Sequence, residues 1–327
     1  MNNRRKLVIA LGAGALTAPF VSFAQQQGKV WRIGFLGADA APARALYSEA
    51  FRAGLRDFGY EEGKNIVMES RWADGKYDRL PDLVADLVRL KVDVIVTYGT
   101  PGSRAAKQAT TTIPIVLANL GDPIASGVVT NLARPGGNIT GSTYFALELY
   151  AKRLELLRDA FPRIRQIAFL VNPDNSSIGP ILHEMEGAAR SLKLELRRFD
   201  ARRPLELDGA FSAMTRSRAG AVVIHQDAMF VGNIKAVCDL AAKNRLASIG
   251  FVESVDAGCL MGYGADNIAL WRRAAYFIDK ILKGTRPGDI PIERATRFEL
   301  IVNMKTAKAI GTKIPQSILF RADKVIE

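Results

Sequence analysis

The sequence predicts an α/β fold built from two Rossmann-like lobes with parallel sheets joined by a hinge, and three observations lead to this prediction. Short apolar runs alternate with helical segments along nearly the whole chain. Several runs are rich in β-branched residues, as at 94–96, which is typical of strands buried on both faces of a parallel sheet. The alternation starts again in the second half, which favours two similar lobes over one long sheet.

The stretch at 92–102 shows the repeating unit most clearly. A strand expected at 94–98 ends in a turn containing Gly99, Thr100, Pro101 and Gly102, and a helical segment follows at 103–108. Such a turn leaves backbone N–H groups unpaired beside the positive end of a helix dipole, which favours an anionic ligand. One turn alone is more often an ordinary connection. The prediction of a binding site depends on comparable turns recurring at the carboxyl ends of strands.

The first residues are predicted to be an export signal. Arg4, Arg5 and Lys6 form a basic start, residues 7–21 are mostly apolar, and Ser22-Phe23-Ala24 is a small-x-small cleavage pattern. The apolar run is short for a membrane span. We expect cleavage after Ala24, and the adjacent arginines leave both the Sec and the twin-arginine routes open.

The remaining composition excludes some classes of function. A chain of 327 residues that loses 24 still has enough length for two domains with their own cores. The net charge of +12 comes from lysines and arginines scattered along predicted helices, without a basic patch interleaved with aromatic residues. We therefore expect a solvated basic surface and no nucleic-acid partner.

The periodicity predicts the elements in order. In the first half, strands are expected at 30–36, 66–72, 94–98, 115–118 and 139–143, and helices at 43–58 and 77–90. In the second half, helices are expected at 148–160, 180–192, 233–244, 267–282 and 305–310, and strands at 167–171, 195–199, 221–225, 247–251 and 298–302.

The domain prediction follows from this order. The segments at 86–99 and 212–227 share one plan, an amphipathic helix, a short basic link, a buried strand and a polar end. We predict a signal peptide at 1–24, an N-terminal lobe at 25–143 plus about 265–297, and a C-terminal lobe at 144–264 plus about 298–327. Hinge connections are expected near 142–145 and 261–264, with a further crossing in the tail.

Catalysis has little support, and we predict a protein that is not an enzyme and has no metal or cofactor. His183 and His225 lack partners at metal-ligand spacing, and there is no nucleophile elbow or phosphate-binding loop. The main enzymatic alternative would use Cys238 and Cys259 as paired acid and base thiols. Cys238 lies mid-helix among apolar residues, which suits packing better than a thiolate. The two cysteines could pair in an oxidising compartment or stay as free thiols.

Polar side chains recur where the predicted strands end, and these are the candidate ligand-binding residues. Most carry short hydroxyl, amide or carboxylate groups, which suit a pocket that fixes a small ligand. Each one alone could instead be a helix cap, a turn residue or part of a solvated loop. The candidates are Asp39, Tyr98, Gly99, Thr100, Pro101, Asn119, Asp122, Ser142, Thr143, Tyr144, Asn175, Ser176, Asp227 and Glu253.

Several phrases of the sequence together carry a family resemblance. They are Ile33-Gly34-Phe35-Leu36, Gly75-Lys76-Tyr77-Asp78-Arg79-Leu80-Pro81, Thr111-Thr112-Ile113-Pro114-Ile115-Val116, Gly121-Asp122-Pro123, the run at 131–141 (NLARPGGNITG), Lys152-Arg153-Leu154-Glu155-Leu156-Leu157, Ile281-Leu282-Lys283-Gly284, Phe298-Glu299-Leu300-Ile301-Val302-Asn303 and Lys305-Thr306-Ala307. With these phrases the chain resembles the ABC-transporter substrate-binding proteins related to the tryptophan/tyrosine-binding lipoproteins. The resemblance implies a type I periplasmic binding protein fold, two lobes closing on a ligand. The chain departs from those lipoproteins in having no lipobox cysteine at the cleavage site, so the resemblance implies a protein of the periplasm without a lipid anchor.

The function expected from the residues and the resemblance is solute binding for an ABC importer. The partner would be an ABC permease in the inner membrane, which recognises the closed form of a monomeric binding protein. The alternative is a periplasmic sensor that presents a bound aromatic or branched carboxylic acid to a signalling receptor.

The charges suggest how a ligand would lie. Residues 99–102 and Ser142-Thr143 suit a carboxylate, and Asp227 and Glu253 suit an ammonium group on the opposing lobe. The aromatic residues Tyr98, Tyr144, Phe145 and Phe230 could cover an apolar side chain. The preferred ligand is therefore an apolar or aromatic amino acid.

Overall fold

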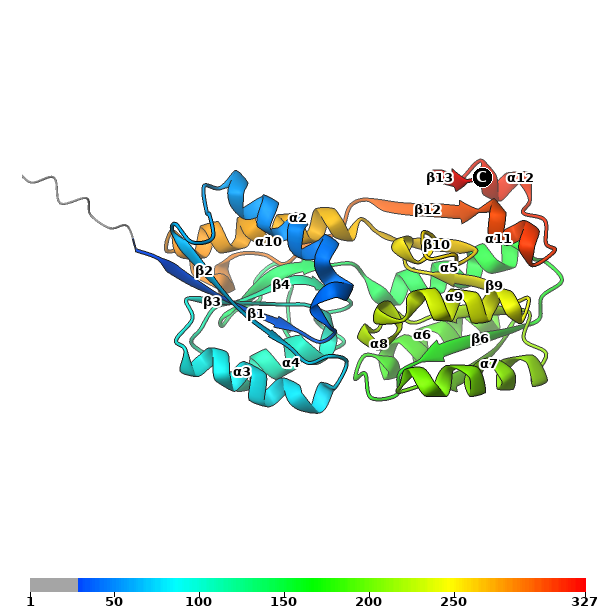
Figure 1. Ribbon diagram of the computed structural model, residues 1–327, viewed down its shortest axis with the longest axis horizontal. Helices are drawn as coiled ribbons and strands as arrows, with labels where there is room; N and C mark the ends of the chain where they lie inside the picture. Colours follow the sequence, from blue (N-terminus) through cyan, green and yellow to red (C-terminus); the bar gives the residue numbers. More distant parts are fainter. Residues whose placement is uncertain (1–28) are drawn as a thin grey trace, which may run out of the picture. The chain divides into compact units, whose positions relative to one another are not determined.

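The apolar runs form two sheets in the computed structural model, which describes residues 29–327 (Figure 1). The predicted signal peptide at 1–24 lies outside the described residues. The first sheet has the strand order β11-β5-β4-β3-β1-β2 and the second the order β13-β12-β10-β9-β8-β6-β7. We call the first sheet with its helices the N-terminal lobe and the second sheet with its helices the C-terminal lobe.

The strands of the N-terminal lobe all pair in parallel. Every residue of β3, β4 and β5 is buried, as expected for central strands of a sheet that is covered on both faces. The strands are β1 (Trp31–Gly37), β2 (Ile66–Trp72), β3 (Val94–Thr97), β4 (Ile115–Leu120), β5 (Ile139–Thr143) and β11 (Glu293–Arg294).

Helices cover both faces of this first sheet (Figure 1). On one face α2 (Ala45–Asp57) and α10 (Asn267–Leu282) pack around the fully buried Trp271. On the other face lie α3 (Leu80–Arg89) and α4 (Gly99–Ala109). The short helices are η1 (Ala41–Arg44), η2 (Tyr77–Arg79) and η5 (Pro287–Asp289).

The strands of the C-terminal lobe are parallel except for one pair. Strand β12 runs antiparallel to β10, because β10 leads the chain out of this lobe and β12 brings it back. The second sheet is therefore mainly parallel, with this one antiparallel pair among its described strands. The strands are β6 (Gln166–Val171), β7 (Glu195–Asp200), β8 (Ala221–Ile224), β9 (Ala247–Gly250), β10 (Met261–Ala265), β12 (Phe298–Asn303) and β13 (Lys324–Ile326).

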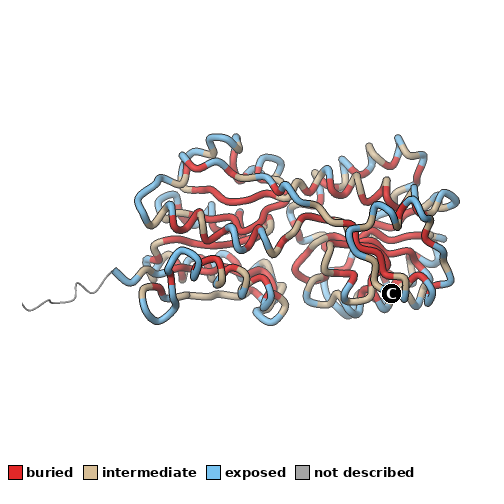
Figure 2. Tube along the Cα trace, turned by 90° about the horizontal axis from the view of Figure 1, so that it is seen from above, coloured by how far each residue is buried: buried red, intermediate tan, exposed pale blue. Residues whose placement is uncertain are grey.

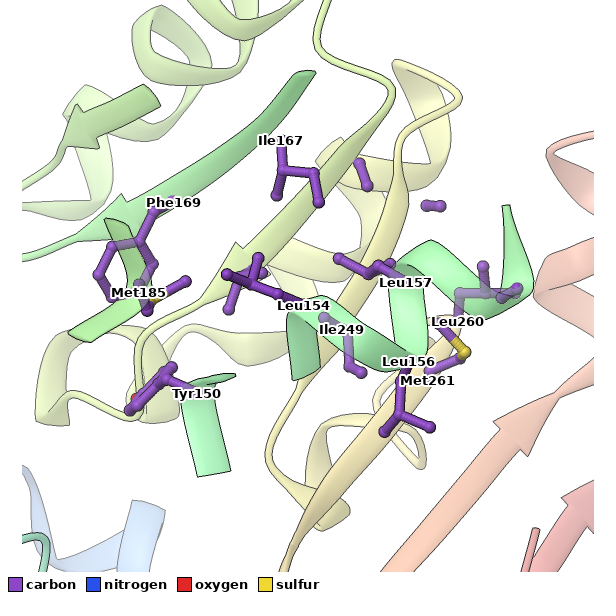
Figure 3. Packing of buried hydrophobic residues seen from close by; sticks show 14 of the residues in the cluster. Tyr150, Leu154, Leu156, Leu157, Ile167, Phe169, Met185, Ile249, Leu260 and Met261 are labelled. Carbon is purple, nitrogen blue, oxygen red and sulfur yellow. The ribbon is translucent and has the colours of Figure 1, made fainter. Parts of the chain in front are cut away.

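The second sheet is also covered on both faces. One face carries α5 (Ala146–Ala160), α6 (Ile178–Ser191), α11 (Met304–Ala309) and α12 (Gln316–Leu319), and Figure 3 shows side chains of α5 and α6 packed on the strands. The other face carries α7 (Leu207–Arg216), α8 (Ala228–Gly232) and α9 (Ile234–Lys243), with η3 (Pro204–Glu206) and η4 (Val252–Ser254) nearby. Buried residues follow the strands and exposed ones gather in loops and on outer helix faces (Figure 2).

The chain passes between the two sheets three times. It does so between β5 and α5, between β10 and α10, and between β11 and β12. The segment at 261–264, expected as a hinge connection, is instead part of strand β10, so the second passage follows Ala265. Its alternating glycines resemble a linker in the sequence, but β9 and β12 supply hydrogen-bonding partners on both sides.

The two cysteines form a disulfide. Cys238 of α9 is bonded to Cys259, just before β10. This finding decides between the two alternatives that the sequence leaves open. Thiols joined in a disulfide cannot serve as the acid and base of the enzymatic alternative.

Candidate ligand-binding site

A pocket lies where the carboxyl ends of strands from both lobes meet. It is partly open to solvent. The residues that line it with polar side chains or backbone are Gly99, Thr100, Gly121, Asp122, Ser126, Asn175, Ser177 and Gln226, and the apolar lining residues are Ala125, Tyr144, Ala146, Leu147, Pro180 and Ile181.

The N-terminal lobe contributes the first turn of α4. Gly99 has a positive φ of 64°, a conformation that suits glycine, and it lets β3 turn at once into the helix. Gly102 must also lack a side chain, because a Cβ there would lie 2.5 Å from Oγ1 of Thr97. Thr100 is buried and lines the pocket at the positive end of the helix dipole.

The C-terminal lobe contributes the turn after β6, which is held by Asp227. This buried carboxylate accepts hydrogen bonds from Nδ2 of Asn175 (2.8 Å), Nδ2 of Asn172 (3.1 Å) and the backbone N–H of Met229 (2.9 Å). A fourth donor is the hydroxyl of Tyr77, which comes from the N-terminal lobe. Burial raises the pKa of Asp227 although these donors oppose the rise.

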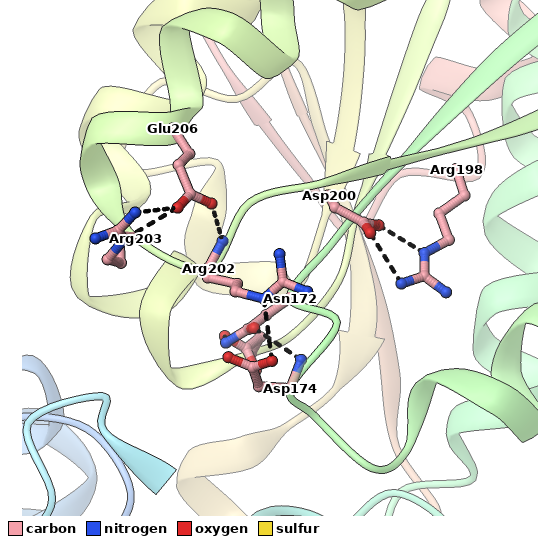
Figure 4. A network of polar contacts seen from close by, with 8 residues as sticks. Asn172, Asp174, Arg198, Asp200, Arg202, Arg203 and Glu206 are labelled. Atoms are coloured by element: carbon pink, nitrogen blue, oxygen red, sulfur yellow. Dashed lines mark hydrogen bonds and ion pairs between the residues drawn. The ribbon is translucent and has the colours of Figure 1, made fainter. Parts of the chain in front are cut away.

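The outer side of the same turn is fixed by a surface network (Figure 4). The backbone N–H of Asp174 donates to Oδ1 of Asn172 at 3.1 Å, and Nε of Arg202 donates to Oδ1 of Asp174 at 3.2 Å. Glu206 in turn accepts from the backbone N–H of Arg202 at 2.8 Å. The turn that presents Asn175 to the pocket is thus held from both sides.

Ser177 brings a histidine next to the pocket. Its Oγ lies 3.2 Å from Nε2 of His225 and donates to Oδ1 of Asn175 at 2.8 Å. Burial, helped by the positive charge of Arg153, lowers the pKa of His225 to about 3, so the ring is neutral at ordinary pH. Nδ1 of His225 has no hydrogen-bond partner among the described residues. The Ser–His pair therefore lacks the orienting third group of a nucleophilic triad.

Asp39 and Tyr98 belong to a separate cluster in the N-terminal lobe. Asp39 accepts from Nε of Arg44 at 2.5 Å and from the Tyr98 hydroxyl. The Arg44 guanidinium lies 5.0 Å from the ring centre of Tyr47 and 4.7 Å from that of Tyr98. Neither Asp39 nor Tyr98 lines the pocket.

The side chain of Glu253, in η4 of the C-terminal lobe, contacts residues of the N-terminal lobe. Its Oε1 accepts from Nδ2 of Asn267 at 3.3 Å, and its Oε2 is buried without a partner. The hydroxyl of Tyr47 is also close to Glu253. Burial raises the pKa of Glu253. Asn119 joins the group because its Nδ2 donates to Oδ1 of Asn267 at 2.9 Å.

The candidate residues from the sequence thus fall into groups. Five line the pocket together, namely Gly99, Thr100, Asp122, Tyr144 and Asn175. Asp227 lies behind Asn175, while Asn119 and Glu253 meet through Asn267.

The other candidates do not line the pocket. Pro101 lies in the first turn of α4, Ser176 is exposed, and Ser142 is buried with no partner for its Oγ. Thr143 donates to the carbonyl of Gly121 at 2.9 Å. Asp122, although it lines the pocket, accepts from the backbone N–H groups of Ile124 and Ala125 in the turn role that its position before a proline suggests.

Sequence reasoning missed several residues of the site. Ser177 and Gln226 lie in the polar turns after β6 and β8 and carry the same signal as their neighbours, so they could have been included. Ser126, Tyr77 and the apolar lining residues other than Tyr144 come from loops and helix starts that carry no such signal.

A metal-binding cluster and a membrane-spanning helix are both absent from residues 29–327. No group of three or more His, Cys, Asp or Glu side chains there could hold a metal ion. No helix in that part of the chain has the length and apolar character needed to span a membrane.

Comparison with known proteins gives a consistent result. Residues 39–326 match the family model described as ABC transporter substrate binding protein. A tyrosine-binding protein of Clostridioides difficile is 28% identical over 271 residues, which cover 82% of this chain and 77% of the relative.

Solved structures show the same fold. A Streptococcus pneumoniae ABC domain in complex with L-Trp has a TM-score of 0.82 at 23% identity, covering 90% of this chain and 99% of that one. A leucine-binding protein of Thermotoga maritima has a TM-score of 0.62 at 11% identity, covering 86% and 87% of the two chains. The expected fold, with two lobes and two mainly parallel sheets, is confirmed.

Proposed function

This chain belongs to the ABC transporter substrate-binding protein family, whose members bind solutes and are not enzymes, and from that premise we propose that it binds an apolar or aromatic amino acid between its two lobes for import. An ABC permease is the partner that membership implies. The periplasm is the proposed compartment, and the proposed form is a monomer with an amino terminus at residue 25. The proposed lobe boundaries fall after residue 143 and near residues 265 and 297.

The pocket is the observation that carries this proposal. Polar residues of both lobes line it together with the apolar residues Tyr144, Leu147, Pro180 and Ile181. A pocket with both kinds of lining suits a ligand that has a polar head and an apolar side chain. Relatives that bind tyrosine and L-Trp are consistent with such a ligand.

The proposed binding mode uses charges on both lobes. The first turn of α4 with Thr100 would receive the carboxylate, since it offers N–H groups at the positive end of a helix. Glu253 and Asp227 would lie on the ammonium side. Of the two, Glu253 has an oxygen, Oε2, with no hydrogen-bond partner among residues 29–327, and the Tyr47 hydroxyl lies close to this carboxylate.

Closure is supported by polar contacts that join the lobes. Tyr77 donates to Asp227, and Asn267 donates to Glu253. Because the pocket is lined by residues of both lobes, a ligand there would touch both lobes and favour the closed state.

Two measurements test the proposal. Mass spectrometry of small molecules released from gently purified, then denatured, protein should identify an amino acid with an apolar or aromatic side chain. Calorimetry with L-tyrosine, L-tryptophan, L-phenylalanine and L-leucine should then show saturable binding of at least one of them. Release of an unrelated solute, together with no binding of any of the four, would disprove the proposed ligand class.

A further inference from the structure

Arg153 is a buried arginine without a counter-ion. It projects from α5 and is 1% exposed. Its Nε donates to the carbonyl of Tyr263 at 3.0 Å, and its guanidinium carbon lies 4.7 Å from the ring centre of Tyr150. One terminal nitrogen has no hydrogen-bond partner, and no carboxylate of the described residues forms an ion pair with it.

Arg44, the other buried arginine among residues 29–327, has the ion-pair partner that Arg153 lacks. Arg44 is 5% exposed and has Asp39 at 2.5 Å. A guanidinium cannot lose its proton in a protein, so burial cannot neutralise it in the way that it neutralises a lysine or a histidine. An unpaired buried charge is strongly unfavourable. Arg153 thus leaves an uncompensated positive charge inside the protein.

This charge lies one layer of side chains behind the pocket. The Tyr150 hydroxyl, next to the Arg153 guanidinium, accepts a hydrogen bond from the backbone N–H of Gln226 at 2.7 Å, and Gln226 lines the pocket. Figure 3 shows Tyr150 with Phe169 and Met185 at one end of the core cluster. The positive charge also contributes to the lowered pKa of His225, which contacts pocket residue Ser177. Its field therefore reaches the pocket wall.

The groups around Arg153 do not cancel this charge. Tyr144, Tyr150 and His225 face it and are neutral at ordinary pH, and the backbone carbonyl of Tyr263 carries no charge. Asp227 forms no ion pair with Arg153 among the described residues and is held by four donors of its own. The remaining charge would be offset by a negative group placed in the pocket.

We propose that Arg153 determines specificity for a ligand carboxylate, acting as a fixed positive charge across Tyr150 and Gln226 and not by direct contact. The inference rests on the proposed function, since it concerns the ligand of the same pocket. Arg153 supplies a full charge, whereas the α4 terminus supplies only about half of one. An amino acid should bind much better than its carboxamide, which has the same shape but no negative charge.

The test compares acids and amides in four forms of the full-length mature protein. These are wild type, Arg153→Lys, Arg153→Gln, and Arg158→Gln as a control, which removes the same charge from a half-buried position of the same helix. Calorimetry measures the binding of L-tyrosine, L-tryptophan and L-leucine and of their carboxamides. For each protein the readout is the ratio of acid affinity to amide affinity, and a melting temperature checks folding.

We expect the ratio to fall on the order of tenfold in Arg153→Gln and to be largely kept in Arg153→Lys and Arg158→Gln. A residue with a merely structural role would weaken acid and amide equally and leave the ratio unchanged. If wild type binds the acid and the ratio is unchanged in Arg153→Gln, this inference is overturned. The proposed function would still stand. If wild type binds neither the acid nor the carboxamide of any of the three amino acids, both the proposed function and this inference are contradicted.

Discussion

The hydroxyl of Tyr77 in the N-terminal lobe donates a hydrogen bond to Oδ2 of Asp227 in the C-terminal lobe. Asp227 also holds Asn172 and Asn175, and Asn175 lines the pocket. One carboxylate therefore joins the two lobes and shapes the pocket wall. For this reason, breaking the contact between the lobes should also loosen the turn after β6, and loosening that turn should weaken the contact between the lobes.

Removing the Tyr77 hydroxyl should favour the open form. The closed state of Tyr77→Phe loses a hydrogen bond to a buried carboxylate, and we expect ligand affinity to fall about tenfold. Small-angle scattering of wild type should show a smaller radius of gyration with ligand than without. The variant should need more ligand to reach that smaller radius. Tyr276→Phe, on an α10 tyrosine that contacts Arg273, is the matched control, and equal effects in both variants would contradict the role of Tyr77.

His225 should make the protein less stable in mild acid. Its pKa is lowered to about 3 by burial, while an unfolded chain binds the proton near pH 6.5. As the pH falls below 6.5 the unfolded state takes up a proton that the folded state cannot, so stability is lost. By pH 5 this loss amounts to about 2 kcal/mol.

The measurement is urea unfolding at pH 7 and pH 5. Asp227 and Glu253 have raised pKa values and contribute with the opposite sign, because stability from such groups falls as the pH rises. They remain in the variant, so the difference between His225→Gln and wild type isolates the histidine. His183→Gln changes the other histidine, an exposed one, and serves as control. An unchanged pH dependence in His225→Gln would refute the prediction.

The disulfide between Cys238 and Cys259 should add stability without contributing to binding. It closes a loop with a sequence separation of 21, for which chain entropy predicts about 3 kcal/mol. Neither cysteine lines the pocket. We expect the double variant Cys238→Ala and Cys259→Ala to unfold at lower urea and to bind ligand as wild type does. Loss of affinity in a folded double variant would show that the bond also positions the pocket.

Local sequence patterns predicted most of the fold. The bounds of β2, β5 and α10 agree with the expected ranges 66–72, 139–143 and 267–282. Each has a clear apolar period and is bounded by turn residues. Strands β11 and β13 were not predicted, because they have two and three residues and exist only through pairing with β5 and β12.

The site could be predicted only in part for a similar reason. Thr100 and Asn175 line the pocket because the ends of parallel strands gather at one edge, which a sequence can reveal. Tyr77 precedes a helix and reaches Asp227 only through the approach of the lobes. Arg153 lies in the middle of an amphipathic helix, where an arginine is usually solvated, and only the packing of α5 against β10 buries it.

Export should remove the first 24 residues. The basic start, the apolar run and Ala24 motivate this prediction. Amino-terminal sequencing of protein from the native host should begin at Gln25, and the protein should be found in the periplasmic fraction. Ala24→Glu is the test variant, since a large charged residue at the cleavage position should leave the longer form uncut. Recovery of the intact Met1 form from the cytoplasm of the wild-type host would refute the prediction.

Glu253 and Asp227 should respond differently to the loss of their charge. Oε2 of Glu253 has no partner, whereas both oxygens of Asp227 accept hydrogen bonds from the chain itself. Glu253→Gln should therefore weaken an amino acid by at least about 2 kcal/mol, because a buried ammonium group would lose its carboxylate. The same variant should bind the analogue without the amino group as well as wild type does.

Asp227→Asn should weaken both ligand classes, because the turn that presents Asn175 would lose its anchor. The measurement is calorimetry with L-tryptophan and indole-3-propionate and with L-tyrosine and 3-(4-hydroxyphenyl)propionate. Glu148→Gln, on an exposed residue of α5, controls for the change in net charge. If Glu253→Gln weakens the amino acid and its deaminated analogue to the same extent, or weakens neither, then Glu253 does not receive the ammonium group. In that case the carboxylate at Asp122, which lines the pocket, becomes the next acceptor to test.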